Sequence, residues 1–243
     1  MPMPPQTDDD QAVRRPLSRE RVLRAAVAFA DEHGIDAVSM RKLGQDLGVD
    51  PMSLYNHVAN KEDLLDGMVD LVVGEIDPAI AEGDGRERDG DGAWKAVLRA
   101  RVMTARATML RHRWASRAIE TRTAASPAVM RHYEAVAGIL RGGGFPVDLV
   151  HHALHALGSR MLGFSQELFD DTAALAEGPE VLALTAHRMA GDFPHLAEMM
   201  LGISHDEATV VGSGCDDQFE FAFALDLLLD GLERLRDAAD RPA

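Results

Sequence analysis

Helix start and stop signals follow one another closely between Ser39 and Asn60. Ser39 can cap a short helix that Gly48 ends, because serine oxygens accept hydrogen bonds from free N–H groups and glycine tolerates a left-handed turn. Asp50-Pro51 starts another helix two residues later, since proline at the first helical position gives up no hydrogen bond. Asn60 caps the next helix. This stretch therefore predicts two short helices joined by a tight turn.

The remaining sequence predicts helices almost throughout, so the expected fold class is all-α. Ser18 caps a helix that runs to His33 and ends at Gly34. Apolar periodicity predicts further helices over 94–110, 114–124, 127–140, 146–169, 179–189, 194–201 and 218–236. No alternating strand pattern of useful length interrupts them.

Composition shifts suggest a division into four parts. These are a disordered arm over 1–16, a three-helix domain over 17–64, a larger helical domain over 65–238 and a tail over 239–243. The segment 82–92 is rich in glycine and charge, which is typical of a linker.

The charge of the chain is distributed unevenly. The net charge is -15, yet residues 14–61 carry eight Lys/Arg against six Asp/Glu. A weakly basic head on an acidic body favours a polyanionic partner at the head alone. The single cysteine, Cys215, and the lack of a long apolar segment or secretory leader indicate a cytoplasmic protein that no membrane holds.

The three N-terminal helices have the outline of a helix-turn-helix, with Gly48-Val49 as the turn. A recognition helix enters the major groove by its first turns, so it can be short. Leu43, Leu47, Leu54 and Val58 have the spacing to pack this module internally. The residues predicted to contact DNA are Arg41, Lys42, Pro51, Met52, Ser53, Tyr55, Asn56, His57 and Lys61.

Residues 39–65, SMRKLGQDLGVDPMSLYNHVANKEDLL, resemble the DNA-binding signature of the TetR family of bacterial repressors. The resemblance implies DNA contacts at Arg41, Met52, Ser53, Tyr55, His57 and Lys61. The C-terminal half is similar to the tetracycline-repressor type of ligand domain, through residues 142–164 and 219–235. It implies a homodimer formed by the 146–169 and 218–236 helices, released from a palindromic operator by a small-molecule effector.

The ligand domain departs from the tetracycline repressors where those proteins hold a magnesium–drug complex. Ile119 and Asp77 stand where the resemblance implies drug- or metal-binding histidines, and Glu167 alone does not make a metal site. The resemblance therefore does not extend to tetracycline with magnesium. A different apolar pocket is predicted from Met103, His112, Trp114, Met161, Phe164 and Gln166, although residues of these types at helical spacing are more often core.

Other interpretations of the sequence are weaker. His151 and His155 share a helix face that could bind a metal, but a third ligand is not evident. Together with His152 they also fit a helix at a dimer interface. We therefore expect neither a metal nor a cofactor. No acid, base and nucleophile come together in a catalytic motif, so we expect no enzyme. Two alternatives stay open: an activator or ligand-independent regulator, and a dimeric small-molecule-binding protein without DNA function.

Overall fold

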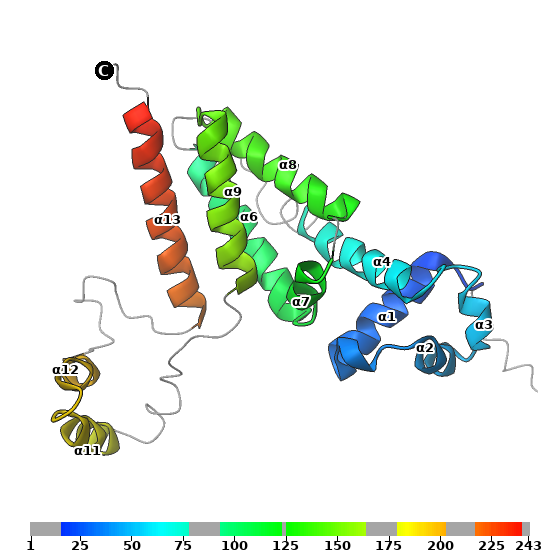
Figure 1. Cartoon of the computed structure of the whole chain (residues 1–243), viewed down its shortest axis with the longest axis horizontal. Coiled ribbons are helices and arrows are strands. Elements are labelled where there is room, and N and C mark those ends of the chain that lie inside the picture. Colours follow the sequence, from blue (N-terminus) through cyan, green and yellow to red (C-terminus); the bar gives the residue numbers. More distant parts are fainter. Residues whose placement is uncertain (1–15, 78–92, 123–124, 164–178, 203–216, 240–243) are drawn as a thin grey trace, which may run out of the picture. The chain divides into compact units, whose positions relative to one another are not determined.

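The computed structural model describes residues 16–77, 93–122, 125–163, 179–202 and 217–239, and every regular element in them is a helix (Figure 1). The all-α prediction is confirmed. The contacts divide the chain into two compact units, one from the described parts of Met1–Glu75 and Arg111–Met130, the other from those of Ile76–Leu110 and Arg131–Ala243. Residues 1–15 of the predicted disordered arm, the linker over 82–92 and residues 240–243 of the predicted tail lie outside the described residues.

The first unit begins with helices whose caps are the ones the sequence predicts. They are α1 (Arg19–His33), the 3-10 helix η1 (Ile35–Ala37), α2 (Met40–Leu47), α3 (Pro51–Leu54) and α4 (Lys61–Gly74). The side chains of Ser18, Ser39, Asp50 and Asn60 each accept a backbone N–H at the start of α1, α2, α3 and α4. Gly34 and Gly48 follow α1 and α2 at positive φ.

Helix α1 packs against both α2 and α4. Its buried face carries Val22, Ala26 and Ala30, and Leu64 and Met68 of α4 are also fully buried. Gly67 permits the close approach of α4 to α1, because a Cβ there would lie 2.6 Å from a methyl group of Leu23. Burial of these apolar side chains is the main stabilising contribution in this unit.

Arg19 joins α1 to the chain segment that leads into α4. Its guanidinium donates to both carboxylate oxygens of Asp63, at 2.6 and 2.9 Å, and to the carbonyl oxygen of His57 at 3.0 Å. Asp63 also accepts the N–H of Ala59 at 2.8 Å. The hydrogen bond from Arg19 and then that from Ala59 lower the pKa of Asp63. These contacts therefore favour the carboxylate form of Asp63.

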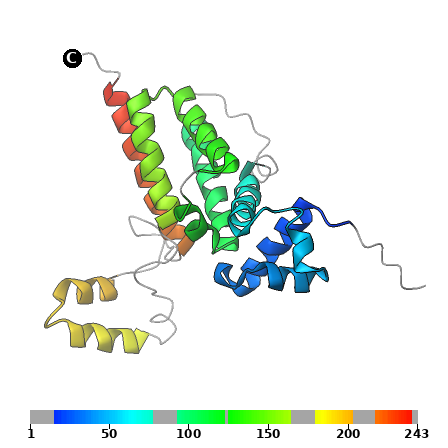
Figure 2. The same cartoon turned by 45° about the vertical axis from the view of Figure 1, so that its right-hand side comes forward.

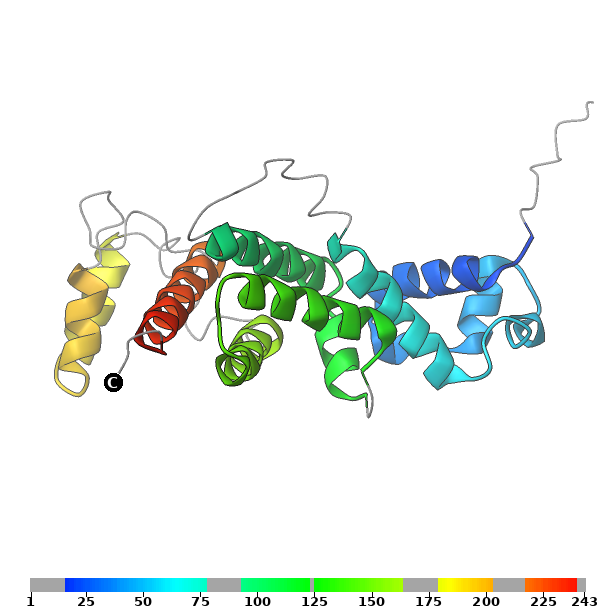
Figure 3. The same cartoon turned by 90° about the horizontal axis from the view of Figure 1, so that it is seen from above.

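The second unit is built on most of α6 (Ala93–Arg111), most of α8 (Pro127–Gly142), α9 (Val147–Gly163) and α13 (Asp217–Ala239), and Figures 2 and 3 show α13 beside α9 and α6. Trp94 and Phe145 meet edge to face in its core, with ring centroids 4.6 Å apart. Lys95 of α6 pairs with Asp230 and Glu233 of α13. Helices α11 (Pro179–Met189) and α12 (Pro194–Gly202) pack against each other as a hairpin.

One helix is shorter than the sequence predicts. The expected helix over 114–124 appears as α7 (Ala115–Glu120). Its end is local: the hydroxyl of Thr121 donates to the carbonyl of Ala118, and the N–H of Arg122 bonds three residues back to Ile119. Such tightened bonds close a helix. Among the described helices, none is long and apolar enough to span a membrane.

Candidate nucleic-acid interface and ligand pocket

The turn between α2 and α3 depends on a glycine inside α2. A Cβ on Gly44 would lie 3.0 Å from the carbonyl oxygen of Val49, 3.0 Å from Cγ of Pro51 and 3.1 Å from its Cα. The carbonyl of Gly44 also accepts the N–H of Val49 at 2.9 Å. Gly44 therefore permits the close approach of α2 and α3. This role of Gly44 could not be predicted from the sequence, because nothing in the local pattern distinguishes a packing glycine from any other helical residue.

Helix α3 places apolar residues on both of its sides. Leu54 and, in the turn that follows, Val58 are buried as predicted, whereas the side chains of Met52 and Tyr55 are 69% and 44% exposed. Exposed large apolar side chains beside buried ones on such a short element indicate a contact surface. Ser53 and His57 are partly exposed and Asn56 is exposed.

The α-helical part of α3 is four residues long, so the residues predicted to contact DNA extend beyond it. Past Leu54 the chain continues in a tightened turn, in which the N–H groups of His57 and Val58 both bond to the Leu54 carbonyl. Tyr55, Asn56 and His57 therefore occupy the turn that closes the helix. Arg19 fixes that turn through the His57 carbonyl.

The basic residues near α3 have few acidic partners. Arg41, Lys42 and Lys61 are exposed, and the described residues place no carboxylate within ion-pair distance of them. Lys42 lies 6.0 Å from the centre of the Phe29 ring. By contrast, Arg19 and Arg122 of the same unit pair with Asp63 and Asp66. Unpaired cations on an exposed face are suited to phosphate contacts.

Helix α4 is held by polar contacts from the segment 111–130, which belongs to the same unit. Arg122 donates to Asp66 at 2.9 Å, and Asp70 accepts the N–H of Ala128 at 2.8 Å. At the end of α4, Glu75 lies 3.2 Å from Arg111. These contacts lie along α4 from its first turns to its last.

His112 and Trp114, predicted to line a ligand pocket, instead contact α1. Nδ1 of His112 lies 2.9 Å from one carboxylate oxygen of Asp31, and Nε2 lies 3.4 Å from Glu75. The indole N–H of Trp114 donates to Asp31 at 2.7 Å. Both side chains therefore help to position α1 within the first unit. The sequence could not predict these contacts, because the carboxylate partners are far away along the chain.

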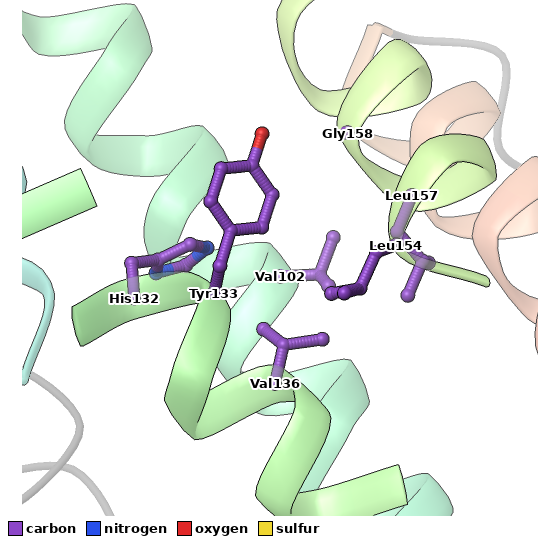
Figure 4. A pocket seen from close by; sticks show the side chains of 7 residues that line it. All are labelled: Val102, His132, Tyr133, Val136, Leu154, Leu157 and Gly158. Atoms are coloured by element: carbon purple, nitrogen blue, oxygen red, sulfur yellow. The ribbon is translucent and has the colours of Figure 1, made fainter. Parts of the chain in front are cut away.

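The other predicted pocket residues belong to the second unit or lie outside the described residues. Met103 is partly buried against the core of that unit. Met161 lies in α9 at a position whose side chain is not described, and Phe164 and Gln166 are outside the described residues. A recess does open in the second unit, lined by Val102, His132, Tyr133, Val136, Leu154, Leu157 and Gly158 (Figure 4).

His132 is not among the predicted pocket residues, because a lone histidine on an apolar helix face resembles a core residue. The structure buries it with only 8% of its surface exposed. Burial, and then the positive charge of Arg101, lower the pKa of His132 to about 4, although Asp77 opposes the shift. The imidazole is consequently neutral at pH 7.

Comparison with known proteins agrees with this geometry. Residues 22–68 match the family model described as bacterial regulatory proteins, tetR family, and residues 87–236 match the tetracyclin repressor-like C-terminal domain. The chain belongs to the TetR family of transcriptional regulators. Members of the TetR family bind DNA operators and small-molecule ligands.

Individual TetR relatives match over much of the chain. The HTH-type transcriptional repressor DrrR1 of Streptomyces coeruleorubidus is 30% identical over 90% of this chain and 78% of its own length. The class D tetracycline repressor of Escherichia coli is 32% identical over 67% of this chain and 72% of its own. A possible TetR family regulator from Streptomyces coelicolor A3(2) has a solved structure with a TM-score of 0.65 and 29% identity, covering 90% of this chain and 100% of that one.

Gly44→Ala tests the close approach of α2 and α3. The added methyl group must displace backbone, so we expect a loss of about 1–3 kcal/mol in the free energy of unfolding, as for other overpacked sites. Gly74→Ala is the matched control, because nothing lies within 4 Å of its Cβ position. That control should be neutral or stabilising by up to about 1 kcal/mol. Urea unfolding measures both, and equal stabilities would contradict the packing role.

The lowered pKa of His132 predicts that the folded protein loses stability in mild acid. The unfolded chain takes up this proton below about pH 6.5, whereas the folded protein resists protonation to about pH 4. Stability is therefore independent of this group above pH 7 and falls as the pH drops through that window, by about 2 kcal/mol between pH 7 and pH 5. Urea unfolding of His132→Phe should show a correspondingly smaller loss. The same change at exposed His187 is the control, and identical slopes for wild type and His132→Phe would contradict the prediction.

Proposed function

We propose that this protein is a homodimeric cytoplasmic repressor that binds a palindromic operator and is released by a small-molecule effector. The observation that carries the proposal is the exposure of Met52 and Tyr55 while Leu54 is buried, in a unit whose exposed cations Arg41, Lys42 and Lys61 have no carboxylate partner among the described residues. A duplex groove accepts that combination, because apolar atoms meet thymine methyl groups and cations meet phosphates.

The residues divide into two kinds of contact. Pro51, Met52 and Ser53, in the leading turn of α3, would meet base edges. The remaining contacts, with phosphates or, for Asn56, with the edge of an adenine, would come from Arg41, Lys42, Tyr55, Asn56, His57 and Lys61. Lys61 starts α4, where free backbone N–H groups also favour phosphate.

Dimerisation through α9 and α13 is supported by their exposed apolar side chains. Val147 of α9 and Phe223, Leu227 and Leu235 of α13 are exposed in the single chain. Apolar surface of this kind is typical of an interface. Two-fold symmetry would then set the two α3 helices about one DNA turn apart, roughly 34–36 Å.

Effector release would act through α4. The contacts of Asp66, Asp70 and Glu75 tie α4 to the segment 111–130, and α4 begins at Lys61. An effector releases DNA only if it binds the DNA-free form more tightly. An activator with the same DNA-binding head is the second candidate, which a reporter assay with gene deletion separates from a repressor.

Lys61→Ala and Ser53→Ala separate phosphate contact from base contact. We expect Lys61→Ala to weaken binding about equally on all operator variants and to lower the salt slope by about 1, because one phosphate contact is lost. Ser53→Ala should change the preference among operator variants. Arg188→Ala, an exposed charge of the second unit, is the control for net charge. Gel shifts at several salt concentrations and with several operator variants measure these effects. Unchanged binding in both variants would contradict the proposed DNA contacts of Lys61 and Ser53.

Leu227→Glu tests the dimer. This side chain is 56% exposed on α13, so a carboxylate there should leave the chain folded while its burial in an interface becomes costly. We expect sedimentation to show a monomer with weaker operator binding. Leu184→Glu on α11, where the side chain is 59% exposed, is the matched control and should remain dimeric. A dimer in both variants would exclude this face of α13.

A further inference from the structure

The recess of the second unit has apolar walls and one buried polar position. Val102 of α6, Val136 of α8, and Leu154 and Leu157 of α9 form the walls, and Gly158 adds no side chain (Figure 4). The cavity volume of the recess is about 20 Å³, and the surrounding empty space of about 280 Å³ includes open solvent, so a ligand larger than a water molecule must displace lining side chains to enter. Walls of this kind favour an apolar ligand body.

His132 supplies the polar position. Its Nδ1 atom is buried and has no hydrogen-bond partner among the described residues, while the ring lines the recess. A buried nitrogen without a partner costs free energy that a ligand can recover by bonding to it. This orphaned nitrogen is therefore an observation independent of the shape of the recess.

The charges around His132 argue against a charged ligand. Arg101 is buried nearby, but its guanidinium donates to Asp77 at 2.6 Å. Among the described residues that line the recess, Tyr133 of α8 is the only other titratable one. These residues offer no carboxylate to a positively charged ligand and no uncompensated cation to a negatively charged one, and burying either charge unpaired is costly.

We propose that the recess binds an uncharged, mainly apolar molecule through a hydroxyl group that hydrogen-bonds to Nδ1 of His132. A hydroxyl both donates and accepts, so it satisfies this nitrogen in either neutral tautomer, whereas a carbonyl satisfies only one. The inference rests on the proposed function in one respect: the molecule that binds here is the effector.

A matched pair of probes tests the hydroxyl. 2-Naphthol and 2-methylnaphthalene differ only by a hydroxyl in place of a methyl group, and calorimetry with the full-length protein compares them. Wild type should prefer 2-naphthol about tenfold, the size expected when a buried polar group gains its partner. His132→Phe should abolish that preference and retain 2-methylnaphthalene. Tyr133→Phe is the control, since it keeps His132 and should keep the preference.

The results separate the ligand inference from the proposed function. Equal affinity of wild type for the two probes, no binding of either up to its solubility limit, or a preference that survives His132→Phe would overturn the ligand inference. Loss of the preference in Tyr133→Phe alone would also overturn it, because the hydroxyl would then bond to Tyr133. Failure of the protein to retain any fragment of a genomic DNA pool would instead refute the proposed function, whatever the probes show.

Discussion

The bidentate contact between Arg19 and Asp63 is the polar constraint that joins three segments of the DNA-binding head. A four-residue helix such as α3 has too few internal hydrogen bonds to hold its own position, so burial of Leu54 and contacts outside the helix must hold it. Arg19 adds a directional constraint to that burial, because the same guanidinium bonds to Asp63 at the start of α4 and to the His57 carbonyl after α3. The turn carrying Tyr55 and His57 is thereby fixed between α1 and α4, and charge-assisted bonds of this kind are directional.

Local features of this fold could be predicted and tertiary ones could not. The caps at Ser39, Asp50 and Asn60 were readable because each side chain bonds to a backbone group within three residues. The role of Gly44 could not be predicted, because it depends on how closely the residues after the turn pack against α2. The bonds of His112 depend likewise on a partner 81 residues away in sequence.

Paired and unpaired charges separate two roles within the first unit. Arg122 and Arg111 pair with Asp66 and Glu75, so their positive charges are compensated by carboxylates and the two ion pairs hold α4. Arg41 and Lys61 have no such partner among the described residues, so no ion pair there compensates their positive charges. The distinction matters because the protein carries a net charge of -15, which repels DNA as a whole. Binding must therefore rest on a few cations that are not neutralised internally.

Helix α8 and one hydrogen bond give the proposed effector a short path to α4. The N–H of Ala128, in the first turn of α8, bonds to Asp70 of α4. His132, which lines the recess, follows four residues later on the same helix, about one turn or 6 Å along its axis. A ligand that shifts α8 at His132 would therefore act on the Ala128–Asp70 bond without any intervening flexible segment. Because α4 starts at Lys61, a small rotation of α4 would displace the proposed phosphate contact of Lys61, and small displacements suffice where two half-sites must be matched together.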